Sequence, residues 1–485
     1  MSGESETYEP LPWERPTAAS LAQPHIVLAW SLDEPDRVGE CIAVDGPRAL
    51  GRGAALADDP APRATPQRMR PGHNQPMPPI GNARIGRIQL LLAPVGSERI
   101  SVTSLGRALV RINGAPLEQA AIARAGDVIE IHNAATYLVT LRPKRLPALR
   151  NGAFPDFEFG GADPFGMIGE SEAAWRLRDA LQLASTTDRH VLLLGDSGTG
   201  KELAARAIHG LSGRRDRSLV CRNAATLPEG IVDAELFGNM RGYPSSGMPE
   251  RPGLFGEADG GTLFLDEIGE LSERMQAHLL RVLDAGGEYQ RLGESKPRRS
   301  SFRLIAATNR ASDALKHDLL ARFTHRVELP TLSERRDDLA LPVAAQLRRI
   351  ASAHPALANR FFERRTGQVA EPRLAPHVIA RLLRHELQHN VRELERLLWL
   401  AIGSAPADYI GLTPALEAEL DDAEQAVAQP APEIDRLTLL RALSEHDRSP
   451  TRMAQALGLK NRYVLIRLLK KHGLSASEPN PGGDA

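Results

Sequence analysis

The chain has little of what stabilises secreted proteins or anchors proteins in a membrane. Only two of its 485 residues are cysteines, Cys41 and Cys221, and their wide separation matches no metal-binding spacing. No apolar run approaches the roughly 18 residues that a membrane-spanning helix needs. The polar, acidic first residues lack the pattern of a secretory signal. We therefore expect a cytoplasmic protein with reduced thiols and no membrane partner.

A large excess of either charge is also absent, because the formal net charge is −1. With 42% hydrophobic residues, this composition predicts a soluble, folded chain. The length suggests about three domains. A near-zero total charge does not exclude nucleic-acid binding, but it requires any basic surface to be local.

Five short apolar runs separated by turn signals predict an all-β sandwich over residues 25–143, after a flexible lead at 1–24. The runs are His25–Trp30, Ile88–Leu92, Ala108–Ile112, Val128–Ile131 and Tyr137–Leu141. Residues 54–79 interrupt them with seven prolines and no periodicity, which predicts a mobile insertion. A linker rich in Pro and Gly is expected at 144–164.

Beyond this linker the pattern changes. Strands alternate with helices over 165–335, which is typical of a parallel α/β domain, and helical patterns alone follow over 336–403. An acidic linker without Lys or Arg is predicted at 404–432, a small all-α domain at 433–474 and a polar tail at 475–485. The expected fold class is therefore multidomain: a β-sandwich, an α/β domain with a helical lid, and an all-α C-terminal domain.

The most informative motif is a nucleotide-phosphate loop that follows the apolar run Val191–Leu194 and precedes a helical pattern. It reads Gly195-Asp196-Ser197-Gly198-Thr199-Gly200-Lys201-Glu202. The glycines let backbone N–H groups turn toward phosphate oxygens, the helix N-terminus adds positive charge, and Lys201 reaches the terminal phosphates. Glu202 stands where a magnesium-binding Ser or Thr is usual. The alternative is a plain Gly-rich turn between a strand and a helix.

Two further strands end in polar residues that suit ATP chemistry. Residues 260–266 read as a buried strand ending in Asp266, which would hold Mg²⁺, and the next residue, Glu267, would polarise the attacking water. Residues 302–309 end in Asn309, a candidate for orienting that water or sensing the γ-phosphate. Ordinary strands followed by polar loop residues are the alternative.

Together with these motifs, residues 166–404 resemble the AAA+ domain of sigma-54-dependent transcriptional activators, the bacterial enhancer-binding proteins. Four more stretches carry the resemblance: Glu235-Leu-Phe-Gly238, Arg251-Pro-Gly-Leu-Phe255, Ala306-Ala-Thr-Asn309 and Asn390-Val-Arg-Glu-Leu394. The family commonly has Glu at the place of Glu202. The resemblance implies ATP and Mg²⁺ as cofactors, and a ring of subunits, usually a hexamer, with ATP at the interfaces.

The resemblance also implies roles for residues that the pattern alone would leave as solvated charges. Arg322 would reach the γ-phosphate bound by a neighbouring subunit, and Lys316 stands for a companion arginine of the family. Arg392 would sense the nucleotide from the helical lid. Asn223 would act with Glu267 to relay the nucleotide state.

The loop with which this family contacts the sigma factor, GAFTGA, is changed here. The chain reads Gly242-Tyr243-Pro244-Ser245-Ser246-Gly247, so that the aromatic residue is displaced by one position, Pro replaces Phe, and Ser replaces Thr. Proline fixes φ and removes a hydrogen-bond donor. We therefore expect a different loop shape, with ATP chemistry retained and sigma-54 remodelling altered or lost.

The segment His385-Glu-Leu-Gln-His389 matches the zinc-protease signature. It directly precedes Asn390, at a place where the resembled family has a turn. Two histidines four residues apart bind zinc from one face of a continuous helix. We expect a helix–turn junction here, and no metal site.

Residues 25–143 resemble a forkhead-associated domain through Leu50–Gly53, Ile112–Gly114 and Gly126–Asp127. Such domains bind phosphothreonine proteins, for which Arg52 would supply one charge-assisted bond. Gly86 occupies the place of the usual serine. A purely structural or oligomer-controlling β domain is therefore the alternative.

Residues 434–474 resemble the Fis-like helix-turn-helix of the same activators. Nine Lys or Arg against three Asp or Glu make this segment the local basic region. An apolar face on the first helix is predicted from Leu437, Leu439, Leu440 and Leu443. Candidate DNA contacts are Arg452, Lys460, Asn461, Arg462 and Tyr463. A helical dimerisation bundle is the alternative.

The sequence thus predicts an ATP-hydrolysing transcription regulator of the sigma-54 activator type. It would bind an enhancer-like DNA site, contact the sigma-54 RNA polymerase holoenzyme and receive its signal through the β domain. Two alternatives stay open: an AAA+ DNA-binding regulator that acts on a target other than sigma-54, and a non-enzymatic DNA-binding adaptor that uses nucleotide to set its oligomeric state.

Overall fold

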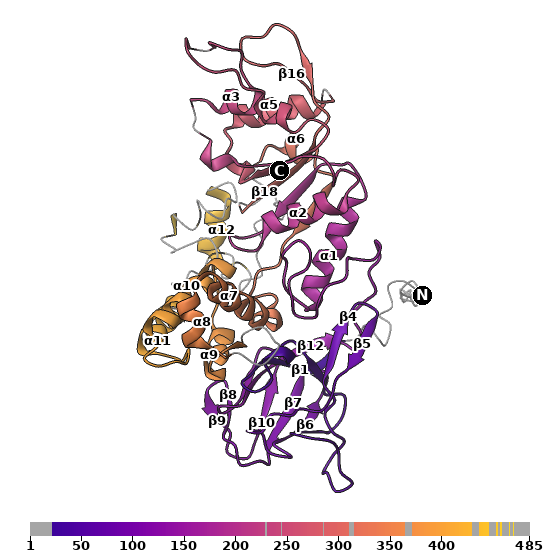
Figure 1. Cartoon of the computed structure of the whole chain (residues 1–485), viewed down its shortest axis with the longest axis vertical. Helices are drawn as coiled ribbons and strands as arrows, with labels where there is room; N and C mark the ends of the chain where they lie inside the picture. The colour runs from indigo at the N-terminus through magenta and orange to yellow at the C-terminus, as the bar shows by residue number, and fades with distance from the viewer. Residues whose placement is uncertain are drawn as a thin grey trace, which may run out of the picture. The chain divides into compact units, whose positions relative to one another are not determined.

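The computed structural model describes residues 22–227, 230–243, 245–284, 286–309, 315–363, 371–428 and 436–445, and the single positions 453, 456, 457, 465 and 469. By internal packing the chain divides into two units, residues 1–417 and 418–485. The first unit contains a β-sandwich, an α/β body and a helical lid (Figure 1). Among the described residues, none of the helices has both the length and the apolar character required to cross a membrane.

The β-sandwich consists of two antiparallel sheets. One has eight strands in the order β5-β4-β2-β1-β12-β11-β8-β9, and the other has four in the order β10-β7-β6-β3. Alternate side chains of both sheets meet in one buried cluster that includes Ile26, Leu90, Ile100 and Tyr137. All five apolar runs overlap strands, which confirms the predicted sandwich. The strands are β1 (Ala22–Ser31), β2 (Cys41–Ala43), β3 (Arg48–Leu50), β4 (Gln67–Arg70), β5 (His73–Pro76), β6 (Leu90–Val95), β7 (Arg99–Ser104), β8 (Val110–Ile112), β9 (Ala115–Pro116), β10 (Ala120–Arg124), β11 (Val128–Ile131) and β12 (Ala135–Pro143).

The prediction of a mobile insertion at residues 54–79 is wrong for its second half. Strands β4 and β5 form an antiparallel hairpin there, and β4 pairs with β2 at Cys41. The prolines hid this hairpin, because Pro71 lies in its turn and Pro76 ends the edge strand β5. These are places where a missing backbone N–H leaves the sheet intact.

The predicted linker at residues 144–164 contains no helix or strand, and the structure describes all of it. It is nevertheless well packed. Leu146 is buried with Val27, Met69 and Trp175, which come from two strands of the sandwich and a helix of the body. The ring of Phe157 stacks on Trp175 with 5.7 Å between centroids. The linker thus lies in an apolar core shared by the sandwich and the body.

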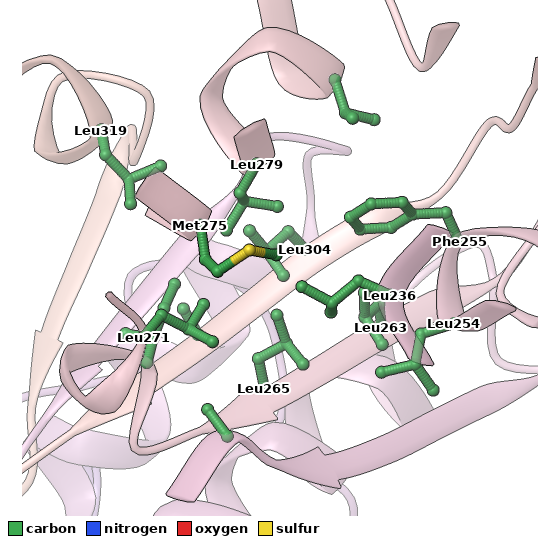
Figure 2. Packing of buried hydrophobic residues seen from close by; sticks show 14 of the residues in the cluster. Leu236, Leu254, Phe255, Leu263, Leu265, Leu271, Met275, Leu279, Leu304 and Leu319 are labelled. Carbon is green, nitrogen blue, oxygen red and sulfur yellow. The ribbon is translucent and has the colours of Figure 1, made fainter. Parts of the chain in front are cut away.

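The body is a parallel sheet of five strands in the order β14-β15-β18-β13-β19. The three inner strands, β15, β18 and β13, are short and largely apolar, as expected when both faces are covered, whereas the edge strands β14 and β19 carry more polar residues. Figure 2 shows one face, where Leu263, Leu265 and Leu304 pack under Met275 and Leu279. The elements are α1 (Glu172–Ser185), β13 (Val191–Leu194), α2 (Lys201–Leu211), β14 (Leu219–Asn223), η2 (Ala224–Thr226), α3 (Val232–Phe237), α4 (Gly253–Glu257), β15 (Thr262–Asp266), η3 (Ile268–Glu270), α5 (Glu273–Asp284), β16 (Glu288–Tyr289), β17 (Arg298–Arg299), β18 (Arg303–Thr308), α6 (His317–Leu320) and β19 (His325–Glu328).

The helical lid follows a short 3-10 turn, η5 (Arg336–Asp338). Its helices bury apolar residues at helical spacing, and in α9 these are Val378, Ile379, Leu382 and Leu383. Pro376 opens α9 at a position where its missing N–H costs no helical hydrogen bond. The lid elements are α7 (Ala340–Ala353), α8 (Pro355–Phe361), β20 (Phe362–Glu363), β21 (Glu371–Pro372), α9 (Pro376–Arg384) and α10 (Asn390–Ser404).

The C-terminal region differs from the prediction in two respects. The expected linker at 404–432 contains a helix, α11 (Pro414–Ala428). In α12 (Arg436–Glu445), Leu439 and Leu443 are buried, but Leu440 is 42% exposed, so its predicted place on the apolar face is wrong. The five candidate DNA contacts lie outside the described residues.

Candidate functional site

The predicted phosphate loop connects β13 to the first turn of α2. Gly198 and Gly200 have φ of +80° and +98°, values that residues with a Cβ rarely adopt. Lys201 is the first residue of α2, and its ammonium group donates to the carbonyls of Gly195 (2.9 Å) and Asp196 (3.3 Å). The turn therefore holds the lysine side chain over its own backbone, at the N-terminus of a helix.

The loop forms one wall of a cavity of about 600 Å³, a size that suits a nucleotide. The body contributes residues 197–203, Asp266 and Glu267, and the lid contributes Arg349, Arg392 and others. The cavity also has an apolar side. Its apolar lining residues are Met167, Ile168, Leu177, Leu203, Leu329, Pro342, Ala345 and Val391.

The predicted carboxylates lie where the parallel strands end. Asp266 ends β15 and pairs in register with Asn223, the last residue of β14. Glu267 has a φ of +51°, a strained conformation of the kind that clusters at functional sites. Its carboxylate accepts a hydrogen bond from the backbone N–H of Asn309 (3.3 Å), just after β18. The sheet thus brings four predicted site residues to one edge, close to the phosphate loop.

Asn223 is held differently from the relay that the sequence suggested. Its side-chain oxygen accepts a hydrogen bond from the Ala225 N–H (2.9 Å) and caps η2. Glu267 instead contacts Asn309. The side chain of Asn223 thus has a backbone partner close by in the chain, whereas that of Glu267 has one at the end of a different strand.

The lid reaches the phosphate loop through the start of α10. Arg392 donates from its guanidinium to the Ser197 hydroxyl. Asn390 is buried, with φ +53°, and bridges two chain segments: it donates to the Ser197 carbonyl (3.0 Å) and accepts from the Leu332 N–H (2.7 Å). A Cβ built on Gly198 would lie 2.4 Å from the His389 carbonyl oxygen, so this glycine permits the close contact.

Two predicted cations lie outside the cavity of their own chain. Arg322 is paired with Asp284, and its side chain is 47% exposed. Lys316 lies 3.7 Å from Glu273. Neither residue lines the cavity. Any part that they take in nucleotide chemistry must therefore involve another subunit or a movement of the chain.

Glu202 differs from a metal-binding hydroxyl in its contacts as well as its chemistry. Its carboxylate pairs with Arg206, one helical turn away, at 2.6 Å. Asp266, Glu267 and, from the lid, Glu395 are the other carboxylates that line the cavity. Oxygen ligands of this kind suit Mg²⁺. Asp266 thus fits the metal better than Glu202.

Three residues of the site were missed in the sequence. Asn390 was seen as part of a motif but not as a contact. Arg335 lines the cavity and donates to the Ile168 carbonyl (2.8 Å). Gln346 lines it from α7 with a buried Oε1 that no donor among the described residues reaches. Arg335 and Gln346 carry no local signal, because a lone Arg or Gln in a helical segment is usually a solvated side chain.

The HExxH segment is a helix–turn junction, as predicted. Helix α9 ends at Arg384 and α10 begins at Asn390, so the two histidines do not share one helix. His385 is buried and contacts the carboxylate of Glu393 at 3.1 Å. Burial acts to raise the pKa of Glu393, but hydrogen bonds from His385 and from the His389 amide hold it below its ordinary value. This polar cluster fixes the turn that precedes α10.

In the β-sandwich, Arg52 and Gly86 are neighbours. The Arg52 N–H donates to the Gly86 carbonyl (3.1 Å), and its guanidinium lies 3.5 Å from the Ala83 carbonyl. Arg52 is exposed. The arginine expected to bind phosphate thus lies beside the glycine that replaces the expected serine.

The loop at residues 239–251 is closed at its base by a buried asparagine. Asn239 donates to the carbonyls of Met240 and Pro249, each at 2.9 Å. Nearer the tip, the Gly242 N–H donates to Met248 (2.8 Å). Tyr243 is 46% exposed and lies against Gly293, where an added Cβ would be 2.7 Å from its ring. Pro244 lies outside the described residues.

Comparison with known proteins assigns the body to the family that its sequence motifs resemble. Residues 167–329 match the model of the sigma-54 interaction domain. The transcriptional regulatory protein ZraR of Salmonella typhimurium is 36% identical over 318 residues, which cover 63% of this chain and 69% of that protein. The nitric oxide reductase transcription regulator NorR1 of Cupriavidus necator is 38% identical over 362 residues, which cover 67% of each.

Among solved structures, a crystal structure of NtrX from Brucella abortus in complex with ADP is similar. It is 29% identical, with a TM-score of 0.45, and the match covers 64% of this chain and 70% of that one.

Proposed function

The chain belongs to the family of sigma-54-dependent transcriptional regulators, and on this basis we propose that it hydrolyses ATP in an oligomeric ring and binds DNA through its C-terminal domain. The sigma-54 interaction domain is of the AAA+ ATPase class. One observation carries the proposal for ATP. The phosphate loop, two strand-end carboxylates and a lid arginine line the same cavity between body and lid.

Lys201 is the residue that we assign to the terminal phosphates. Its ammonium group is bound to two carbonyl oxygens, which are neutral acceptors. Phosphate oxygens are charged acceptors and form stronger bonds with an ammonium group. The first N–H groups of α2 lie beside it and favour an anion. Arg392, bound to the Ser197 hydroxyl, adds a second positive charge from the lid.

The hydrolytic residues that we propose are Asp266, Glu267 and Asn309. Asp266 would hold Mg²⁺, which neutralises phosphate charge when bound. Glu267 is placed to accept a proton from the attacking water. Its hydrogen bond from the Asn309 backbone fixes the carboxylate at the strand ends. Arg322, exposed on the surface, would act as an arginine finger: its guanidinium would contact the γ-phosphate bound by the next subunit of a ring.

Gln346 is our candidate for reading the base. The apolar side of the cavity can enclose a purine ring, and Gln346 adds one polar atom there. Its buried Oε1 is an acceptor without a donor among the described residues. The 6-amino group of adenine supplies such a donor, whereas guanine has a carbonyl at that position. Satisfying a buried polar atom favours adenine.

DNA binding rests on sequence alone. The basic segment 434–474 and its five candidate contacts, Arg452, Lys460, Asn461, Arg462 and Tyr463, form the proposed interface. Phosphothreonine binding at Arg52 is the weaker part of the proposal, because Gly86 provides no hydroxyl beside it. A structural role of the sandwich fits that surface equally well.

The test is phosphate release from ATP by the full chain over a range of protein concentrations. We expect turnover per subunit to rise with concentration, because Arg322 would act on a neighbour. Lys201→Ala should abolish it, and Glu267→Gln should bind ATP without turnover. Turnover that is independent of concentration contradicts the ring. ATP binding without any turnover in a single-turnover assay supports the nucleotide-dependent adaptor instead.

A second candidate function is regulation of a target other than sigma-54. The observation that favours it concerns the loop at 239–251, where the ring of Tyr243 lies against Gly293. An isomerisation assay with sigma-54 holoenzyme on premelted promoter DNA distinguishes the two. Promoter isomerisation that requires ATP supports sigma-54 activation. Intact ATPase activity without isomerisation supports the other target.

A further inference from the structure

The β-sandwich makes buried polar contacts with both parts that enclose the nucleotide cavity. Toward the junction of body and lid, Arg142 at the end of β12 donates two hydrogen bonds to Asp337, at 3.0 and 2.5 Å. The two side chains are only 3% and 12% exposed. Since charged groups are seldom buried without a partner, this pair fixes the end of β12 on η5.

The segment that receives Arg142 is connected to the cavity wall. Asp338, next to Asp337, is fully buried and accepts from the Glu170 N–H (2.7 Å), the Ser171 N–H (2.7 Å) and the Ser171 hydroxyl (2.6 Å). Arg335 lies 4.0 Å from Asp338 and donates to the carbonyl of Ile168. Arg335 and Ile168 both line the cavity. A shift of η5 therefore moves two cavity-lining residues.

A second contact joins the sandwich to the body beside this wall. Arg70 of β4 donates to Glu170 and to the Phe157 carbonyl, each at 2.8 Å. Glu170 also accepts from the indole N–H of Trp175 in α1 (3.0 Å). The guanidinium of Arg70 lies 4.3 Å from the centre of the Phe157 ring. Together with the apolar core around Leu146, this arrangement holds the sandwich on the body.

The sandwich also binds the lid. The indole of Trp30 in β1 donates to the Leu374 carbonyl (3.0 Å), and the hydroxyl of Thr136 in β12 donates to the Pro376 carbonyl (2.9 Å). Both bonds are buried. Helix α9 packs on β1, β11 and β12. The lid in turn supplies Arg392 and Asn390 to the phosphate loop.

We propose that the β-sandwich braces lid against body, so that Arg142 positions the nucleotide site without touching the nucleotide. The inference rests on the proposed nucleotide site and concerns its control. Strands β1 and β12 bind the lid, while β12 and β4 bind the body and the junction. A ligand that shifts these strands changes the width of the cavity, and a nucleotide that closes the cavity stabilises these strands, because coupling between two sites is reciprocal.

The first test measures the affinity of the full chain for magnesium-ATP at a temperature where every variant is folded. Arg142→Met removes the ion pair with Asp337 that joins the sandwich to η5. Arg63→Met is the matched control, because Arg63 forms a buried ion pair with Asp59 inside the sandwich. We expect Arg142→Met to weaken binding by about fivefold or more, the lower end of typical coupling between sites. Arg142→Lys should give an intermediate value, and Arg63→Met the wild-type value.

Equal affinities of wild type, Arg142→Met and Arg63→Met would overturn the brace while leaving the nucleotide site intact. A wild-type chain that binds no magnesium-ATP would overturn the proposed function, and the brace with it. A loss of thermal stability shared by both methionine variants, without a difference in affinity, would show that the ion pair is structural only.

A second test needs no substitution at Arg142. Hydrogen exchange of the backbone amides of β12 and α9 is measured on the full chain with and without magnesium-ATP. Exchange in both elements should slow in the wild type and stay unchanged in Lys201→Ala. Protection confined to the phosphate loop and α10 would contradict the coupling, because the brace requires that nucleotide binding be felt in β12.

Discussion

The contact between phosphate loop and lid depends on the absence of a side chain at Gly198. In Gly198→Ala the new Cβ would lie 2.4 Å from the His389 carbonyl oxygen, whereas ordinary contacts begin at 3.4 Å. Loop and lid would therefore have to separate by about 1 Å. Such a shift disturbs the bonds from Asn390 to Ser197 (3.0 Å) and from Val391 N–H to Gly198 (3.4 Å).

Two costs add up in this variant. A residue with a Cβ in the left-handed region costs about 1–2 kcal/mol, and each disturbed hydrogen bond costs about 0.5–1.5 kcal/mol. Gly53→Ala is the matched control. Gly53 has nearly the same φ, +78°, but nothing lies within 4 Å of its added Cβ. We expect Gly198→Ala to lower the free energy of unfolding by about 2–5 kcal/mol, against about 1–2 kcal/mol for Gly53→Ala.

The assay combines chemical denaturation with titration of magnesium-ATP. The weakened loop–lid contact should reduce ATP affinity about tenfold in Gly198→Ala, since 1.4 kcal/mol corresponds to a factor of ten. Affinity in Gly53→Ala should remain that of the wild type. If both variants bind ATP as the wild type does, the lid contact contributes nothing to the site, and the reasoning from this geometry fails.

Two further predictions follow from single buried groups. Gln346→Leu should reduce the preference for ATP over GTP about tenfold, because it removes the buried Oε1 that would accept a hydrogen bond from the adenine amino group. An equal preference in wild type and variant, measured by competition binding, would contradict this role of Gln346. Burial is the largest cause that lowers the pKa of His25 to about 4, so the unfolded chain binds more protons between pH 6.5 and 4. His25 should therefore contribute a fall of about 2 kcal/mol in the free energy of unfolding from pH 7 to pH 5. Denaturation of His25→Leu at both pH values should show a drop smaller by about that amount.

The sequence predicts the parts of the site that are formed by neighbours along the chain. The phosphate loop can be predicted because eight consecutive residues form it, and Asp266 can be predicted because an apolar strand precedes it. The positions of Asp266, Glu267 and Asn309 at one sheet edge follow from the rule that parallel strands end together. These elements lie where the motifs place them.

Contacts between segments that are distant in the chain could not be predicted from the sequence. Asn390 and Ser197 are 193 residues apart, and Arg142 and Asp337 are 195 apart. Nothing local marks them, because their partners are chosen by the packing of whole domains. The same holds for the hairpin β4–β5, which is stabilised by pairing with β2 rather than by its own proline-rich sequence.

Mixing two inactive variants tests the central claim most directly. Lys201→Ala lacks a working phosphate loop, and Arg322→Ala lacks the proposed finger. In a ring with shared sites, a Lys201→Ala subunit supplies Arg322 to the intact loop of an Arg322→Ala neighbour. Random mixing in equal amounts should then restore about a quarter of wild-type ATP turnover. A mixture as inactive as its components, or full activity of Arg322→Ala alone, would contradict a site completed by the adjacent subunit.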